Sequence, residues 1–510
     1  MGLDTNSRSR RTSQVGLVLG PFIFFLVLLG FDLEPGHPEV TRTAAVALLM
    51  AVWWMTEAIP LAATALIPVV LFPALGIMDG RTVAPIYFNH IIFLFIGGFL
   101  VALAMQRWDL HRRIALRILL LFGVQPARIL LGFMVATAFL SMWISNTATT
   151  MMMVPIVLAV VLKLEENAGE ERVRRFGTSL FLGVAYGASI GGIATLVGTP
   201  PNLSLTRILT IQFPQSPEIS FASWFAFGFP ISVVFLAIAW CVLRWIFSVR
   251  KEGIDLNLHV IREQYSALGP VSYQEAVVLV DFVLLALLWL FRSNITIGPI
   301  FIPGWSSWLA NGSLLNDGTI AVAMALVLFV IPARHRSAGR LMDWRVAKNL
   351  PWHIVLLFGG GFALASGFKD SGLSQWFGVQ LQGLGVLHPL GLVASLCLVI
   401  TFLTELTSNT ATAEMLLPIL GSLGIGVKQN PMLFMIPGTL SCSFAFMLPV
   451  ATPPNAIVFG TDKVKISDMV RAGVVLNFIG VGLIVLAIYT LGTVVLDVGA
   501  TGLPGWAEIE

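Results

Sequence analysis

Two identical five-residue segments carry most of the polar chemistry of this chain. Ser145-Asn146-Thr147-Ala148-Thr149 recurs as Ser408-Asn409-Thr410-Ala411-Thr412, at an interval of 263 residues (408 − 145). Each copy lies inside a strongly apolar stretch, where polar side chains and unwound backbone are costly. Free carbonyl oxygens at helix ends suit a hard cation such as sodium, and free N–H groups at helix starts suit an anion. One such tip could therefore contact both a sodium ion and a carboxylate.

A second repeated motif interrupts two other apolar segments. Thr199-Pro200-Pro201-Asn202 recurs as Thr452-Pro453-Pro454-Asn455, 253 residues later (452 − 199). Paired prolines remove two backbone donors and disfavour helix before them, so we expect an unwound break at each motif. Gly198 and Ala451 precede the breaks, and small residues leave backbone carbonyls approachable. Polar interruptions at matching places in two halves indicate the binding site of a transporter.

Hydroxyl side chains recur beside each Asn of the repeated pentapeptide. Ser141 and Ser145 are four residues apart and share a helix face, and Thr404 and Ser408 hold the equivalent positions. No Lys or Arg lies within either Ser-Asn-Thr or either Thr-Pro-Pro-Asn segment. A bound anion must therefore be balanced mostly by helix dipoles, amide donors and co-bound cations. We accordingly hypothesise that substrate binding requires sodium.

Composition excludes a soluble enzyme with a single anchor. Of 510 residues, 57% are hydrophobic and 11% are charged, whereas soluble domains have about 25% charged residues. Apolar runs near the spanning length of ~20 residues recur from end to end. The three cysteines lie far apart without metal-ligand spacing, which argues against disulfides and a zinc site. The chain is therefore interpreted as an all-α polytopic membrane protein.

The apolar runs predict about eleven transmembrane helices and two re-entrant hairpins. The hairpins are expected at 127–162 and 387–425, each with a Ser-Asn-Thr tip and two arms shorter than a full span. A charged loop is expected at 163–175, and a basic amphipathic helix at the lipid surface at 107–122. The spans are expected at 15–31, 42–59, 61–76, 89–105, 222–248, 274–292, 318–332, 351–366 and 468–496, with broken spans from 177 and at 432–459.

Charge placement orients this path. With a cytoplasmic N-terminus, all but six of the 30 Lys and Arg residues fall on the cytoplasmic side, as the positive-inside rule requires. An odd number of spans then places the C-terminus outside. The first hairpin enters from the cytoplasm and the second from outside, so the halves are expected to be inverted-topology repeats.

Other polar residues in apolar segments have simpler interpretations. Glu405 and Glu414 flank the second tip, but Met142 and Met151 stand at the equivalent places of the first. An orienting role is therefore favoured over direct ligation for both carboxylates. Glu57 is expected at the end of a span because Pro60 follows it.

Two glycine-rich segments also recur at the 263-residue interval. Gly97-Gly98 and Gly359-Gly360-Gly361 are interpreted as close-packing positions between helices, since no strand precedes them as in a phosphate loop. His90 and His353 begin these segments and are expected to be interfacial anchors and not proton carriers.

At these residues the chain resembles the divalent anion/sodium symporter family, which carries dicarboxylates, citrate or sulfate. The Ser-Asn-Thr tips, the Pro-Pro-Asn breaks and the segment Trp53-Trp54-Met55-Thr56-Glu57-Ala58-Ile59-Pro60 match its pattern over nearly the whole chain. The resemblance implies a homodimer and an elevator-type alternating-access mechanism. The implied scaffold domain comprises 1–122 and 251–383, with connecting arms near 107–122 and 367–383, and the implied transport domain comprises 123–250 and 384–510.

The resemblance also implies residues for each site. The first sodium ion would be bound by Ser141, Ser145, Asn146 and Gly198, and the second by Thr404, Thr407, Asn409 and Ala451, several through backbone carbonyls. The substrate carboxylates would contact Asn146 and Thr147 at one tip and Ser408, Asn409 and Thr410 at the other, with Thr199 and Pro453 lining the pocket.

Sodium-coupled import of a C4-dicarboxylate such as succinate, malate or fumarate is the leading interpretation. Both tips keep Thr as their third residue, whereas relatives that favour citrate can differ at the second tip. A sulfate or citrate transporter, a sodium-independent dicarboxylate exchanger of the same fold and an anion channel remain alternatives. An enzyme is disfavoured because the chain has no His-Glu-x-x-His motif. The compact loops favour a bacterial inner membrane, and no nucleic-acid partner is expected.

Overall fold

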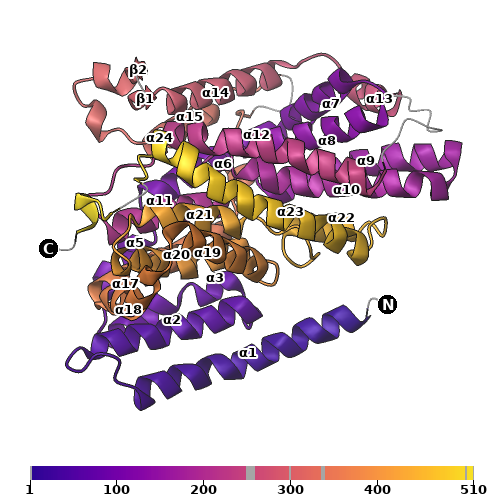
Figure 1. Ribbon diagram of the computed structural model, residues 1–510. Helices are drawn as coiled ribbons and strands as arrows, with labels where there is room; N and C mark the ends of the chain where they lie inside the picture. Colours follow the sequence, from indigo (N-terminus) through magenta and orange to yellow (C-terminus); the bar gives the residue numbers. More distant parts are fainter. Residues whose placement is uncertain (1–2, 249–258, 298–299, 335–338, 500–501, 509–510) are drawn as a thin grey trace.

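The computed structural model describes residues 3–248, 259–297, 300–334, 339–499 and 502–508, and nearly all of its elements are helices (Figure 1). Within this described part the only strands are β1 (Ile295–Ile297) and β2 (Ile300–Ile302). They form one antiparallel hairpin in which Ile295 lies opposite Ile302.

The helices follow the chain in two series. Those of the first half are α1 (Leu3–Gly30), α2 (Pro38–Thr56), α3 (Leu61–Thr64), α4 (Ile67–Ala74), α5 (Gly80–Ile86), α6 (His90–Arg107), α7 (Leu110–Phe122), α8 (Pro126–Ser141), α9 (Asn146–Ala168), α10 (Glu170–Gly192), α11 (Pro200–Gln212) and α12 (Phe221–Ile246). Those of the second half are α13 (His259–Ala267), α14 (Tyr273–Leu290), α15 (Asp317–Val330), α16 (Trp344–Ala347), α17 (Trp352–Asp370), α18 (Leu373–Leu381), α19 (Pro389–Thr404), α20 (Asn409–Gly426), α21 (Met432–Cys442), α22 (Pro453–Phe459), α23 (Ile466–Ala487) and α24 (Thr493–Val495). Short turns of other helix types are η1 (Trp305–Trp308), η2 (Gly312–Leu314), η3 (Gln382–Val386), η4 (Ile488–Gly492) and η5 (Gly505–Ala507).

Length and composition mark many of these helices as membrane-spanning. In the described part, 7 helices are long and apolar enough to cross a membrane, or up to 8 if the pair Leu373–Val386 and Pro389–Thr404, bent by 118°, counts as one span. Shorter apolar helices occur at Leu61–Ala74, Pro126–Ser141, Asp317–Val330 and Met432–Cys442. The predicted class, an all-α polytopic membrane protein, is thereby confirmed, whereas the count of eleven spans stays a prediction.

Both Ser-Asn-Thr segments lie at a turn between two helices. The turn between α8 and α9 runs from Ser141 to Asn146, and the turn between α19 and α20 runs from Thr404 to Asn409. Pro126 and Pro389 begin the first helix of each pair, at the position where a missing N–H is harmless. The two pairs therefore begin and turn at matching residues of the two halves.

Two local expectations are wrong. The arm after the first tip is not short, because α9 has 23 residues and runs on to Ala168. Residues 163–175 are not a loop but the ends of α9 and α10, separated only by Gly169 with φ 85°. Lys163 bonds Glu166 at 2.9 Å, three residues on, and Glu170 and Glu171 lie at the N-terminus of α10. Both charge arrangements favour helix.

The expected amphipathic helix at 107–122 is present as α7, but one of its arginines faces protein. Arg113 donates to Glu275 of α14 at 2.7 Å, and the two side chains are only 8% and 6% exposed. A buried, hydrogen-bonded ion pair fixes α7 on α14, so Arg113 is not a lipid-facing charge as the basic pattern had indicated.

The proline motifs break two helices as predicted. α10 ends at Gly192 and α11 begins at Pro200, while α21 ends at Cys442 and α22 begins at Pro453. Each later helix carries Pro-Pro in its first turn, after an extended Thr at φ −141° or −142°. Prolines suit the first turn of a helix but prevent it from continuing backwards, which explains both breaks.

The helices around the breaks pack in a reciprocal pattern. α8 lies on α10 and α19 lies on α21, so each tip is beside the broken helix of its own half. Beyond the break, α11 packs on α20 and α21, and α22 packs on α9 and α10. Each half therefore supplies its short helix to the other half.

Close packing of α6 on α15 depends on one of two neighbouring glycines. A Cβ at Gly97 would lie 2.4 Å from the carbonyl carbon of Ala321, a distance that real Cβ atoms do not adopt. A Cβ at Gly98 would lie 3.4 Å from its nearest neighbour, a ring carbon of Trp289, which is an ordinary contact. Gly97 thus allows the backbones of α6 and α15 to approach closely.

We expect Gly97→Ala to lower the free energy of unfolding by about 1–3 kcal/mol, because overpacking forces α6 and α15 apart. Gly98→Ala should be neutral or stabilising, since Ala is the better helix former by about 1 kcal/mol. Thermal unfolding of the two purified variants in detergent measures the difference. Equal melting temperatures would contradict the close approach at Gly97.

Candidate functional site

The first tip is held by the side chains of its own residues. Ser145 is the N-cap of α9, and its hydroxyl oxygen accepts from the N–H of Ala148 at 3.3 Å. Ser141, at the end of α8, donates through its hydroxyl to Oδ1 of Asn146 at 2.5 Å. Two helix ends therefore meet at Asn146, with the free N–H groups of α9 beside it.

Backbone carbonyls of the first break crowd around the same asparagine. A Cβ at Gly192 would lie 2.7 Å from Oδ1 of Asn146 and 3.2 Å from the carbonyl oxygen of Gly198. A Cβ at Gly198 would lie 2.5 Å from the carbonyl oxygen of Gly192 and 3.0 Å from that of Ser141. Oxygen atoms of Ser141, Asn146, Gly192 and Gly198 therefore surround a place that only glycine backbone leaves open. Such a set of neutral oxygens fits a hard monovalent cation.

The second tip has the same hydroxyl–asparagine contact as the first, but different residues lie around it. Oγ1 of Thr404 lies 2.8 Å from Oδ1 of Asn409 and 2.9 Å from the carbonyl oxygen of Cys442, where α21 ends. Thr407 instead bonds Thr412, with 2.7 Å between the two hydroxyl oxygens. At this tip, the oxygens of Thr404, Asn409 and Cys442 therefore lie close together.

Only some of the residues predicted to bind each cation therefore lie together in the structure. In the first set, Ser141, Asn146 and Gly198 come together, while Ser145 caps its helix. In the second set, among described residues, a hydrogen bond joins only Thr404 and Asn409. Ala451 is buried in the second break, and its N–H donates to the carbonyl of Leu448 at 3.2 Å.

Sequence reasoning missed the carbonyls of Gly192 and Cys442. Each lies at the end of a helix, several residues before its proline motif. The pair Gly191-Gly192 was a signal, because two glycines just before a break mark a close approach of backbone. Nothing in the sequence around Cys442 distinguishes its carbonyl.

The asparagines that end the two proline motifs hold the breaks in shape. The amide nitrogen of Asn202 donates to the carbonyl of Thr195 at 2.7 Å and lies 3.4 Å from that of Gly192. The amide nitrogen of Asn455 donates to the carbonyls of Leu448 at 3.0 Å and Ala445 at 3.1 Å. These acceptors are again 253 residues apart in the two halves. Each asparagine thus replaces the hydrogen bonds that the broken helix lacks.

Different side chains tie the tip to the break in the two halves. In the first half, the hydroxyl of Thr195 donates to the carbonyl of Met142 at 2.5 Å and accepts from the N–H of Gly198 at 3.0 Å. In the second half, the carboxylate of Glu405, the counterpart of Met142, accepts from three consecutive backbone N–H groups. They belong to Phe446, Met447 and Leu448, at 2.7, 2.9 and 3.0 Å.

Both flanking glutamates join helices, in line with the orienting role expected for them. Asn477 of α23 also donates to Glu405, at 2.8 Å. Glu414 is fully buried on α20 and accepts from the hydroxyl of Ser204 on α11 at 2.5 Å. The Ser204–Glu414 bond joins α11 of the first half to α20 of the second, as does the bond from Gln212 to the carbonyl of Pro418 at 2.9 Å.

The predicted substrate residues lie around these tips with graded exposure. Thr147, Ser408 and Asn409 are half-buried, Thr199 and Thr410 are buried, and Pro453 is exposed. Ser408 is the N-cap of α20 and Thr199 is the N-cap of α11. The start of α20 can offer N–H groups to an anion, whereas α11 begins with two prolines that have none.

The chain is similar to known proteins over most of its length. A family model described as the sodium:sulfate symporter transmembrane region matches residues 19–498. The sodium-dependent dicarboxylate transporter SdcS of Staphylococcus saprophyticus is 43% identical over 493 residues, covering 96% of this chain and 93% of that protein. SdcS of Staphylococcus aureus strain RF122 is 43% identical over 492 residues, covering 95% and 92%.

A solved structure shares the fold at low sequence identity. The YdaH transporter of Alcanivorax borkumensis matches with a TM-score of 0.55 and 14% identity, covering 88% of this chain and 99% of that one. A likeness at this identity concerns the arrangement of the helices alone.

We expect Glu405→Gln to lower the free energy of unfolding by about 1–3 kcal/mol, because an amide group cannot accept from all the N–H donors that the carboxylate satisfies. Glu57→Gln is the matched control, since Glu57 is exposed at the end of α2. Thermal unfolding of both variants in detergent tests this, and a Glu405→Gln protein as stable as the control would contradict it.

Proposed function

Because this chain belongs to the sodium:sulfate symporter family, we propose that it imports a C4-dicarboxylate, such as succinate, malate or fumarate, together with sodium. The family is the one that the sequence motifs indicated. Its members in the comparison are named as transporters, which agrees with the expectation that the chain is not an enzyme.

One observation carries the sodium assignment. The oxygens of Ser141, Asn146, Gly192 and Gly198 crowd together without a charged side chain among them. Carbonyl, amide and hydroxyl oxygens are hard, neutral ligands, and they suit sodium better than a divalent ion that demands carboxylates. In the described residues no group of three or more His, Cys, Asp or Glu side chains could hold a metal ion.

We assign two sodium sites to the two tips. The first comprises Ser141, Ser145, Asn146 and Gly198, with the carbonyl of Gly192 added. The second comprises Thr404, Thr407, Asn409 and Ala451, with the carbonyl of Cys442 added. The repeated hydrogen bonds from Ser141 to Asn146 and from Thr404 to Asn409 support the pairing of the two sites.

The substrate would lie between the tips, near both cations. Its carboxylates would bind Asn146 and Thr147 at one end and Ser408, Asn409 and Thr410 at the other, beside Thr199 and Pro453. Helix starts at α9 and α20 supply the N–H groups, and each sodium ion offsets charge that no Lys or Arg at the tips balances. This arrangement makes sodium part of the anion site.

An elevator mechanism would move these elements as one body. Residues 123–250 and 384–510 would form the transport domain, and 1–122 and 251–383 the scaffold; the boundary at 250/251 lies outside the described residues. The exchange of α11 and α22 between halves supports one interlocked transport domain, and it is the pattern that inverted repeats would produce. We further propose a homodimer in a bacterial inner membrane, with the N-terminus cytoplasmic and the C-terminus outside.

Uptake of labelled succinate into proteoliposomes tests the transport proposal. We expect accumulation above equilibrium only with an inward sodium gradient. Asn146→Ala and Asn409→Ala should each raise the half-saturating sodium concentration about tenfold or more, since a lost hydrogen-bonding or ionic partner costs about 1.5–3 kcal/mol. Asn311→Ala, at an exposed loop position, is the control.

Other results of the same uptake experiment would support one of the alternative functions. Equal uptake in potassium, stimulated by internal dicarboxylate, would mean an exchanger and would remove the sodium sites. Competition by sulfate or citrate without succinate uptake would replace the substrate. Uptake that never exceeds equilibrium and does not saturate would indicate an anion channel.

A cross-link across the proposed sliding surface tests the elevator. The amide nitrogen of Gln212 on α11 lies 3.3 Å from the hydroxyl of Ser374 on α18, on the two sides of that surface. In a Cys241→Ser background, Gln212→Cys with Ser374→Cys should lose uptake when linked by mercuric ion and regain it on reduction.

The matched pair for this experiment lies within the proposed transport domain. Ser220 and Ser223 have hydroxyl oxygens 3.2 Å apart at the start of α12, so linking cysteines there should leave uptake unchanged. Normal uptake by the linked Gln212/Ser374 pair would rule out relative movement at this contact.

A further inference from the structure

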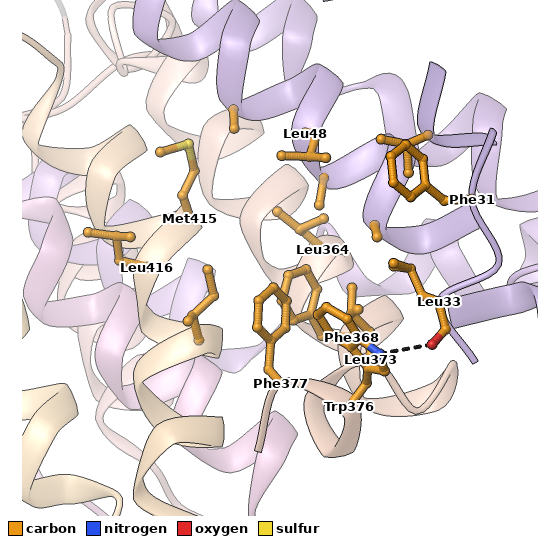
Figure 2. Close-up of a pocket in the computed structure, with 15 residues that line it drawn as sticks. Phe31, Leu33, Leu48, Leu364, Phe368, Leu373, Trp376, Phe377, Met415 and Leu416 are labelled. Carbon is orange, nitrogen blue, oxygen red and sulfur yellow. Dashed lines mark hydrogen bonds between the residues drawn. The ribbon is translucent and has the colours of Figure 1, made fainter. Parts of the chain in front are cut away.

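An apolar cavity of about 340 Å³ lies between helices of the two halves (Figure 2). Its walls come from α1 and the turn after it, α2, α17, α18 and α20. Leu48 of α2 and Leu364 and Phe368 of α17 face Met415 and Leu416 of α20 across it. Both α2 and α20, the helix that follows the second Ser-Asn-Thr tip, thus contribute to the cavity wall.

The lining excludes water and charged ligands. Its residues are Val, Leu, Ile, Ala, Phe, Met and one Trp, and none carries a charge. The indole N–H of Trp376 is already used, because it donates to the carbonyl of Leu33 at 3.0 Å (Figure 2). A water molecule needs two to four polar partners, which this cavity does not offer. Its occupant must therefore be hydrocarbon.

The surroundings of the opening supply such an occupant. Phe31 and Leu48, which line the cavity, are 56% and 41% exposed, so it opens to the outside of the helical bundle. α1 beside it is one of the apolar helices long enough to span a membrane, and only 17% of its spanning window is buried. The medium at this opening is therefore the acyl region of the bilayer.

The size of the cavity favours an inserted chain over an empty space. Apolar cavities of about 150 Å³ already bind an aromatic molecule, and ligand sites begin near about 300 Å³. An empty space of this size deprives its lining of dispersion contacts, whereas a flexible chain can fill it to the density of a protein interior.

We propose that one acyl chain of a membrane phospholipid inserts into this cavity and packs between α2 and α20. The chain contacts Met415 and Ile419, which lie one helical turn apart on α20. The neighbouring residue Glu414 bonds Ser204 of α11. The lipid therefore packs against α20, which follows the second tip and bonds α11 of the other half. This binding does not depend on the transported substrate.

Photolabelling with a phospholipid that carries a diazirine in mid-chain tests the proposal on the full-length protein in nanodiscs. Leu364 and Phe368 are 1% and 2% exposed, so lipids around the protein cannot reach them unless a chain enters the cavity. We expect label on the α17 peptide that contains these residues and on the α20 peptide that contains Met415. Ala47→Trp, which fills the cavity from α2, should remove both labels.

Val234→Trp on α12 is the matched control, since Val234 is 47% exposed and does not line the cavity. It should leave the α17 and α20 labels intact. Ala51→Leu is a milder filling variant from the same helix and should reduce them, so the test survives if Ala47→Trp does not fold.

Three results would overturn the proposal. The first is label on exposed helices such as α12 without label on α17 in the wild-type protein. The second is α17 label that persists in both filling variants. Loss of the label on adding a free fatty acid, but not on adding unlabelled phospholipid, would also overturn it, because the occupant would then be a fatty acid.

Discussion

A backbone that leaves its helix inside a membrane must find hydrogen-bond partners within the protein, and both halves of this chain are organised by that constraint. Two proline pairs create the breaks, and two asparagines of the same motifs supply amide donors to the carbonyls that the breaks release. Carbonyl oxygens at the ends of the broken helices, such as those of Gly192 and Cys442, lie beside the tips. The same unwinding that would destabilise a simple span thus gathers neutral ligands at one place.

The two halves satisfy this constraint with different side chains. A threonine hydroxyl both donates and accepts in the first half, whereas a carboxylate accepts three N–H groups in the second. The carboxylate therefore adds a negative charge beside one break only. The first half has methionine at the equivalent position, so its tip has no such carboxylate.

Repeated local motifs explain what the sequence could predict. The tips lie between helices that end and begin at Ser141, Asn146, Thr404 and Asn409 because short polar residues there favour caps and turns over helix interior. The breaks follow from proline alone. The lengths of α9 and α10 were misjudged because clustered charges resemble a loop in composition, although their spacing favours helix.

The remaining details of the site depend on contacts between distant residues. Gly192 and Cys442 contribute carbonyls because the ends of α10 and α21 lie beside the tips, and no local pattern encodes that approach. The burial of Arg113 against Glu275 is likewise set by a helix that follows 162 residues later in the chain. The basic periodicity of α7 is compatible with either a lipid or a protein neighbour.

Two glycines of the first break are replaced by alanines in the second break. Gly192 and Gly198 correspond, 253 residues on, to Ala445 and Ala451. A methyl group at either glycine would collide with oxygen atoms 2.5 to 2.7 Å away, whereas the second half carries a methyl group at both places. At these two positions the residue of the first half can replace that of the second without a steric clash, but the reverse exchange cannot be made. The two breaks share a sequence motif, yet their residues are not interchangeable at these two positions.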